Sequence, residues 1–270
     1  MEESELIDND RPTGRDRLGQ YGLMLYPLWQ WLVLIPAAVV VTVIAALISV
    51  LVSLAGFPSV ANLQVAPRWA RIIAWLTPMQ VEIEGFEHVE PGRSYVVVAN
   101  HLSQYDILLI YGYCGLDLRW VMKAEIGSIP FVAQGCRAIG HIFIDRGNPE
   151  QARLAINRAV GELPDGAGVL FFAEGTRSRS GELMPFRKGA FRVAADRGMA
   201  ILPMTVVGTR AILQPGSIRI RPGRARLIIG APIEPQAGAV DHVTQSLCQR
   251  TREQIARTLE ANTENGSGKF

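Results

Sequence analysis

A histidine and an aspartate five residues apart are the first candidates for chemistry in this chain of 270 residues. His101 and Asp106 lie in the segment NHLSQYD, directly after the apolar run 94–99, which has the character of a buried strand. In α/β folds, reactive side chains gather where strands end, and Asp106 would begin the next helix. An imidazole can accept a proton from a hydroxyl near neutral pH, and a carboxylate on its other ring nitrogen orients it. The pair predicts a general base with its partner; the alternative is a structural histidine beside a helix-capping aspartate.

A second polar segment, FFAEGTRSRSG, covers residues 171–181 and continues another apolar run. Gly175 allows a ligand to approach the backbone closely, Thr176 offers a hydroxyl, and Arg177 offers a planar guanidinium that suits phosphate. The segment therefore predicts a phosphate-binding loop. Four more basic side chains could meet an anion or an acidic membrane surface, or could simply be solvated: Arg179, Arg187, Lys188 and Arg192.

Two further strand-like runs end in basic residues. Arg146 closes the segment GHIFIDR and could join Arg177 around the same phosphate, whereas His141 at the other end of that run is expected to be structural. Lys123 closes the run LRWVMK and is either another phosphate contact or an exposed strand end. Pro203 lies inside the run ILPMTVV, which predicts a strand edge or a bulge bordering a groove.

The spacing of apolar residues along the chain predicts the strands and helices that position these side chains. From about residue 80, short apolar runs alternate with amphipathic stretches, which predicts an α/β fold with a mixed, largely parallel sheet flanked by helices. The expected strands are 81–86, 94–99, 118–122, 141–144, 169–173 and 201–207, and the expected helices are 105–113, 149–163, 186–197 and 241–261. Residues 218–229 predict a hairpin that turns at Pro222 and Gly223.

The N-terminal part of the chain has a different character. Residues 18–67 carry no charged side chain and contain the apolar run 31–56, which as a helix at about 1.5 Å per residue would exceed the roughly 30 Å hydrocarbon core of a bilayer. We expect a membrane helix; an in-plane or re-entrant helix pair and a buried core helix are the alternatives. A secretory signal peptide is a poor match, because the acidic start lacks a basic region and the apolar run is too long. The predicted organisation is an acidic arm (1–20), a membrane-anchoring segment (21–78), a catalytic domain (79–262) and a flexible tail (263–270).

Composition narrows the function classes. The chain is 49% hydrophobic and 19% charged, which excludes a disordered protein. Its net charge of +2 is too small to predict a nucleic-acid partner, although the part after residue 17 carries +5. Three widely spaced cysteines predict neither a disulfide framework nor a zinc site, and we expect no metal or bound cofactor. Because a G-x-S-x-G nucleophile motif is also absent, the residues favour direct acyl transfer to a hydroxyl.

The segments NHLSQYD, GHIFIDR, FFAEGTRSRSG and ILPMTVV resemble, in the same order, the four sequence blocks of the glycerolipid acyltransferases, typified by bacterial 1-acylglycerol-3-phosphate acyltransferase. The resemblance covers about half of the chain. It implies that His101 is the general base, that Asp106 is its partner, and that Pro203 lies near the groove of the acyl donor. It also implies a set of residues that hold the acceptor's phosphate: Arg146, Glu174, Gly175, Thr176 and Arg177.

The same resemblance implies a reaction. A fatty acyl group would pass from acyl-CoA or acyl-carrier protein to the free hydroxyl of lysophosphatidic acid, giving phosphatidic acid for phospholipid synthesis. Because thioester donors are cytosolic, the catalytic domain is expected on the cytoplasmic face of the cell (inner) membrane, where an apolar anchor and a basic body would hold it against anionic lipids. The alternatives are acylation of another lyso-lipid, hydrolysis of the thioester by water, and lipid binding without catalysis.

Overall fold

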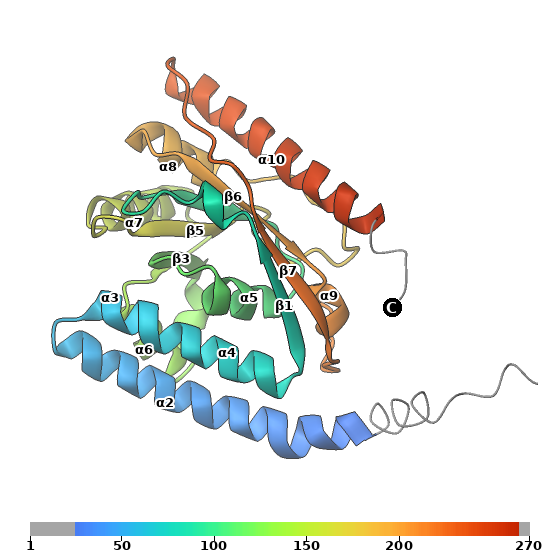
Figure 1. The fold of residues 1–270 in the computed structure, drawn as a ribbon. Helices are drawn as coiled ribbons and strands as arrows, with labels where there is room; N and C mark the ends of the chain where they lie inside the picture. The colour runs from blue at the N-terminus through green and yellow to red at the C-terminus, as the bar shows by residue number, and fades with distance from the viewer. Residues whose placement is uncertain (1–24, 265–270) are drawn as a thin grey trace, which may run out of the picture.

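The computed structural model describes residues 25–264 (Figure 1). The predicted acidic arm, and the predicted tail from residue 265 on, lie outside the described residues. The described chain contains a seven-stranded sheet in the order β1-β7-β6-β2-β5-β3-β4, in which every neighbouring pair is parallel except β6 and β7. The predicted mixed, largely parallel sheet is thus confirmed. Its strands are β1 (Met79–Glu84), β2 (Val96–Ala99), β3 (Leu118–Lys123), β4 (Ile142–Ile144), β5 (Gly168–Phe172), β6 (Ile201–Val207) and β7 (Gly223–Ile229).

The predicted hairpin over 218–229 is wrong. Only its second half is a strand, and β7 finds its partners far away in sequence: it runs parallel to β1, with Met79 opposite Gly223, and antiparallel to β6, with Met204 opposite Ile229. The first half, residues 218–222, belongs to a loop that hydrogen-bonds to the N-terminal helix instead.

The expectation that Pro203 marks a sheet edge is also wrong, because β6 lies between β2 and β7. The Pro203 carbonyl accepts a hydrogen bond from Gly230 N (2.8 Å), so the nitrogen of the same residue also faces the β7 side. The ladder with β7 ends at Ile229, just before this position. The missing N–H of proline therefore costs no ladder hydrogen bond.

Helices cover both faces of the sheet. In Figure 1, α8 and α10 lie above it, and α2 and α4 lie below it. The upper layer consists of α7 (Pro149–Gly161), α8 (Gly189–Arg197) and α10 (Val240–Glu264), which form one core cluster with residues such as Phe191 and Leu247. The lower layer consists of α4 (Ala66–Leu76), α5 (Tyr105–Tyr113) and the short α9 (Thr209–Ile212), which form a second cluster around Leu109 and Leu202. Asn148 caps α7 by accepting a hydrogen bond from Gln151 N, and Pro149 fits its first turn.

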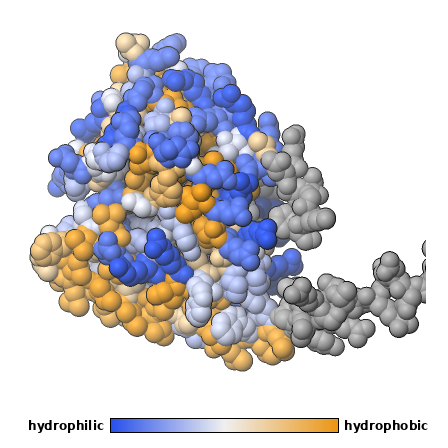
Figure 2. All heavy atoms as spheres, viewed as in Figure 1, coloured by the Kyte–Doolittle hydropathy of each residue, from blue (hydrophilic) through white to orange (hydrophobic). Residues whose placement is uncertain are grey.

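An N-terminal helical hairpin completes the lower layer. Its first arm is a continuous helix of 30 residues, Leu25–Leu54, that includes a π-helical turn (Gln30–Leu34) and α2 (Ile35–Leu54). The chain returns through α3 (Pro58–Val60), a second π-helical turn (Ala61–Val65) and α4. Figure 2 shows apolar residues along the exposed side of this hairpin. By length and composition alone, the first arm could cross a membrane.

The hairpin packs along its length against the rest of the domain. A Cβ on Gly135 of α6 (Val132–Ala138) would lie only 3.1 Å from Ala46 of α2, so the two helix backbones approach closely. Asn62, which is 1% exposed, donates to the Leu118 carbonyl (3.0 Å) and to Asp117 Oδ1 (2.6 Å). These bonds join the hairpin to the start of β3.

Candidate active site

His101 and Asp106 are held together by the turn between β2 and α5. His101 Nδ1 lies 2.7 Å from Asp106 Oδ2, and the same oxygen accepts hydrogen bonds from the backbone N–H groups of Leu102 (2.6 Å) and Ser103 (2.9 Å). The hydroxyl of Thr209 donates to the other carboxylate oxygen. Asp106 is fully buried and cannot rotate without breaking these bonds. A carboxylate at Nδ1 favours the tautomer that leaves Nε2 of His101 as a proton acceptor.

The imidazole is also fixed from the side of the sheet. Phe172, at the end of β5, stacks on it with ring centroids 3.8 Å apart and an interplanar angle of 11°. The His101 side chain keeps 15% exposure and lines a cavity of about 740 Å³. The predicted base is therefore rigid, oriented and open to a space large enough for a ligand.

The polar residues of the site converge because the strands that carry them are parallel neighbours. β2, β5, β3 and β4 lie side by side, and His101, Gly175, Lys123 and Arg146 lie at or just beyond their carboxyl ends. All four residues line the mouth of the cavity, as do Thr176 and Arg177. Of the expected substrate-binding residues, the structure thus brings five together with the predicted base.

The mouth is strongly basic around Gly175. Arg146 donates a hydrogen bond to the Gly175 carbonyl, and a Cβ on Gly175 would lie 2.6 Å from Arg187 Nε. Burial, and next the charge of Arg187, lower the pKa of Arg146. Within residues 25–264, no salt bridge engages Arg146, Arg177 or Arg187, while Lys123 pairs with Glu125 (2.5 Å). Uncompensated guanidiniums this close together favour a multiply charged anion such as phosphate.

Two of the residues expected at the substrate, Glu174 and Pro203, do not line the cavity. Glu174 is 4% exposed; one carboxylate oxygen accepts from His101 N (2.7 Å) and the other from Met184 N (2.9 Å). Burial raises its pKa, and the two backbone donors partly offset this. Glu174 thus braces the catalytic turn instead of facing the mouth. Pro203 is buried next to Gly230, on the sheet face covered by α10, away from the cavity.

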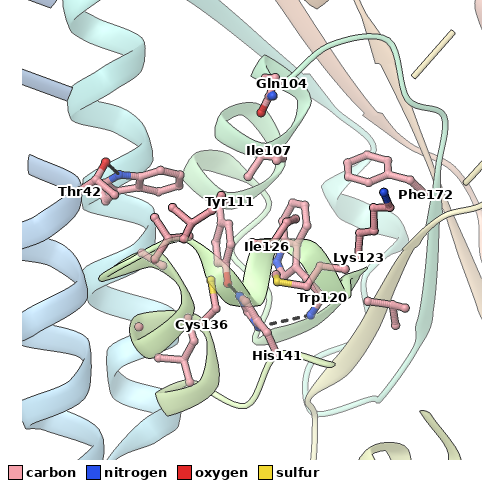
Figure 3. A pocket seen from close by; sticks show the side chains of 18 of the residues that line it. Thr42, Gln104, Ile107, Tyr111, Trp120, Lys123, Ile126, Cys136, His141 and Phe172 are labelled. Carbon is pink, nitrogen blue, oxygen red and sulfur yellow. Dashed lines mark hydrogen bonds between the residues drawn. The ribbon is translucent and has the colours of Figure 1, made fainter. Parts of the chain in front are cut away.

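The rest of the cavity is apolar and reaches the N-terminal hairpin. Its walls include Ala45, Ala46 and Trp69 from the hairpin, Val132 from α6, and Ile129 just before α6. Figure 3 shows the aromatic side chains of Tyr111 and Trp120 between Thr42 of the hairpin and Lys123 at the mouth, with Phe172 next to Lys123. The arrangement suits an amphiphile with an anionic head at the mouth and a hydrocarbon chain inside.

Residues 80–207 match the family model for an acyltransferase. These residues form a domain of this acyltransferase family. The chain is 34% identical over 199 residues to a chloroplastic 1-acyl-sn-glycerol-3-phosphate acyltransferase of Arabidopsis thaliana, an alignment that covers 73% of this chain and 53% of the relative. The chain thus spans about half the length of that relative. It is 29% identical to a 1-acyl-sn-glycerol-3-phosphate acyltransferase of Chlamydomonas reinhardtii, over 90% of this chain and 70% of the relative.

A solved structure shares the fold. The 1-acyl-sn-glycerophosphate acyltransferase of Thermotoga maritima superposes with a TM-score of 0.65 at 22% identity, covering 88% of this chain and 99% of that one. At this identity the similarity speaks for the fold alone. Because it extends over 88% of this chain, it reaches beyond the acyltransferase match at 80–207.

The chain also holds a buried polar network deep in the cavity. Tyr111 donates to Asn62 Oδ1 (2.8 Å) and hydrogen-bonds to His141 Nε2, while Trp120 N contacts His141 Nδ1 (3.4 Å). Burial, and next the charge of Arg119, lower the pKa of His141 to about 3. His141 is therefore neutral and anchors β3, α5 and the hairpin to one another, in agreement with its expected structural role.

Sequence patterns did not single out three contributions to this site. Thr209 comes from α9, about one hundred residues after the aspartate it contacts, and nothing in its neighbourhood marks it. Arg187 was one of four basic residues without a predicted place; its backbone N–H bonds to the Ala173 carbonyl (2.8 Å), which brings it to the loop. The α2 wall of the cavity carries small residues, whose spacing along an apolar helix does not show what they contact. Within residues 25–264, no group of three acidic, histidine or cysteine side chains could hold a metal ion.

Proposed function

We propose that this acyltransferase transfers a fatty acyl group from a thioester donor, acyl-CoA or acyl-carrier protein, to the free hydroxyl of lysophosphatidic acid, giving phosphatidic acid. The observation that carries the proposal is a single cavity that joins an oriented imidazole, a basic mouth and an apolar interior. These three parts fit the reacting hydroxyl, the phosphate and the acyl chain. The names of the relatives favour this acceptor over other lyso-lipids.

His101 Nε2 accepts the hydroxyl proton as the hydroxyl oxygen attacks the thioester carbonyl carbon. The tetrahedral intermediate then collapses, the C–S bond breaks, and the thiolate takes the proton from the imidazolium. A thiol has a pKa near 8.5, so it leaves with little assistance from an acid. Asp106 stabilises the imidazolium that forms between the two proton transfers. No step is assigned to a metal or to a bound cofactor.

The basic residues position the acceptor. Arg146 bonds to the Gly175 carbonyl, Arg187 lies beside Gly175, and Arg177 lines the same mouth. A phosphate could bind their guanidiniums and the Thr176 hydroxyl there. Holding the acceptor by its phosphate fixes its hydroxyl near His101 and so raises the effective concentration of the nucleophile. Loss of a guanidinium should therefore raise the KM for the acceptor.

The N-terminal hairpin attaches the enzyme to a membrane in this proposal. Its first arm packs lengthwise against α4 and α6, with an apolar outer side that includes Leu47, Leu51 and Leu54. This packing favours an orientation along the membrane surface, with the outer side in the acyl-chain region, over a span that leaves the domain. We place the enzyme on the cytoplasmic face of the cell membrane, where its donors are available.

The test uses the purified full chain with radiolabelled acyl-CoA, with and without lysophosphatidic acid. We expect labelled phosphatidic acid only when the acceptor is present. His101→Ala should lower turnover by about 100-fold or more, while His242→Ala, an exposed histidine on α10, should not change it. Release of free fatty acid at the same rate without acceptor would identify a hydrolase, and equal rates with lyso-lipids that lack a phosphomonoester would reject the assigned acceptor.

A further inference from the structure

The loop between α9 and β7, residues 214–221, is attached to the N-terminal helix. Figure 1 shows this loop reaching down to the first turns of that helix. Gln30, which is 4% exposed, donates from Nε2 to the Ile218 carbonyl (2.6 Å) and accepts at Oε1 from Ile220 N (3.0 Å). A buried amide in an apolar helix needs such partners. The helix and the loop therefore form one surface.

That surface combines an exposed apolar side chain with unpaired positive charge. Ile218 is 70% exposed, and Arg219 and Arg221 on either side of Ile220 are exposed and form no salt bridge with the rest of residues 25–264. On the helix beside them, Trp31 is 54% exposed and Leu32 is 73% exposed. An apolar patch bordered by aromatic and basic residues is typical of a protein surface at the level of lipid headgroups.

We propose that residues 214–221 form a second membrane-contacting element that binds anionic phospholipid headgroups. Ile218 enters the boundary between headgroups and acyl chains, and Arg219 and Arg221 pair with lipid phosphates. The proposal rests on the proposed attachment of the hairpin to a membrane. The loop is bound to a helix whose own exposed side is apolar. This favours a lipid surface over an acidic protein as the partner, because a protein would have to displace lipid from the helix to reach the loop.

The loop is also connected to the catalytic turn. It begins directly after Leu213, whose carbonyl accepts a hydrogen bond from Ser103 Oγ (2.7 Å), and Ser103 N bonds to Asp106. At the other end of the loop, Arg221 N donates to the Ile212 carbonyl (2.9 Å). Lipid bound at the loop would thus lie against the structure that holds the base.

Hydrogen exchange measured by mass spectrometry tests the proposal on the full chain. The protein is reconstituted into vesicles of phosphatidylcholine alone and of phosphatidylcholine with phosphatidylglycerol at 7:3. The apolar helix retains the protein in both, so only the headgroup charge changes. We expect amide exchange in 214–221 to be at least three-fold slower in the anionic vesicles. High salt should remove the difference, because it screens exposed charges.

Variants identify the side chains responsible. Arg219→Gln with Arg221→Gln should abolish the difference, and Ile218→Ser should reduce it. The matched control, Arg250→Gln with Arg257→Gln, removes the same charge from exposed positions on α10 and should leave it intact. Equal exchange in both vesicles, or equal loss in the control, would overturn the proposal. Slower exchange caused only by added acyl-carrier protein would instead identify a protein partner. The readout needs no turnover, so it is independent of the assigned reaction.

Discussion

Replacing Glu174 with glutamine distinguishes a brace for the catalytic turn from a contact to the acceptor's phosphate. In the structure, both carboxylate oxygens of Glu174 accept backbone N–H groups, from His101 and from Met184. Glutamine has the same shape but only one oxygen. If that oxygen faces His101 N, the amide group points its own hydrogens at Met184 N, and two donors meet inside a buried site.

The expected size of the effect follows from this mismatch. A buried donor left without a partner costs about 1–3 kcal/mol. If the whole cost falls on the position of His101 in the transition state, kcat falls about 5- to 150-fold, at 1.36 kcal/mol for each factor of ten. The free energy of unfolding should fall by a similar 1–3 kcal/mol. The KM for the acceptor should change little, because Glu174 does not line the cavity.

The assay measures kcat and the acceptor KM with acyl-CoA, together with thermal unfolding in detergent. Glu182→Gln serves as the control, since it removes the same charge from an exposed position eight residues away. A Glu174→Gln enzyme with normal kcat and normal thermal stability, but a raised acceptor KM, would refute the bracing role. It would restore the role that the sequence motif suggests, a direct contact to phosphate.

Three other perturbations test different parts of the structure. Gly175→Ala places a Cβ 2.6 Å from a guanidinium nitrogen at φ +73°, so the acceptor KM should rise several-fold, whereas Gly92→Ala, at φ +77° with no atom within 4 Å, should leave it unchanged. Ala45→Leu adds bulk to the apolar wall and should lower kcat/KM for long acyl donors more than for short ones; an equal loss for all chain lengths would remove the chain from this part of the cavity. His141, whose pKa is lowered to about 3, stays neutral while the unfolded chain protonates it below about 6.5, so stability should fall by roughly 1.4 kcal/mol per pH unit between pH 6 and 4; His141→Gln should flatten this slope in pH-dependent unfolding.

Much of the site was accessible from the sequence because it is built from strand ends. His101, Lys123, Arg146 and Gly175 each follow a run of buried β-type residues, and neighbouring parallel strands necessarily bring such positions to one edge. Local pattern thus predicted both the strands and the polar turns after them. Of the residues expected at the substrate, five lie at the ends of β3 and β4 or in the turn that follows β5, and these line the cavity mouth: Lys123, Arg146, Gly175, Thr176 and Arg177.

Contacts between distant segments were not accessible in the same way. The strand pairing of β7 with β1 joins residues more than 140 positions apart, and a turn-forming Pro-Gly pair suggested a local hairpin instead. Glu174 shares a motif with Gly175, yet it lies in the turn after β5, and there its side chain points inward, to backbone donors. Short patterns report residue types well, but they do not report which side of the chain faces a ligand.

The small side chains of α2 have a consequence for any attempt to prepare this enzyme in soluble form. Ala45 and Ala46 belong to the hairpin and also enclose the interior where the fatty chain is proposed to bind. Deleting the hairpin to improve solubility would expose the cavity to water and would remove Asn62 from the polar network around His141. Detergent or lipid would then compete with the substrate for the exposed cavity. The apolar N-terminal hairpin therefore has to be kept together with the catalytic domain.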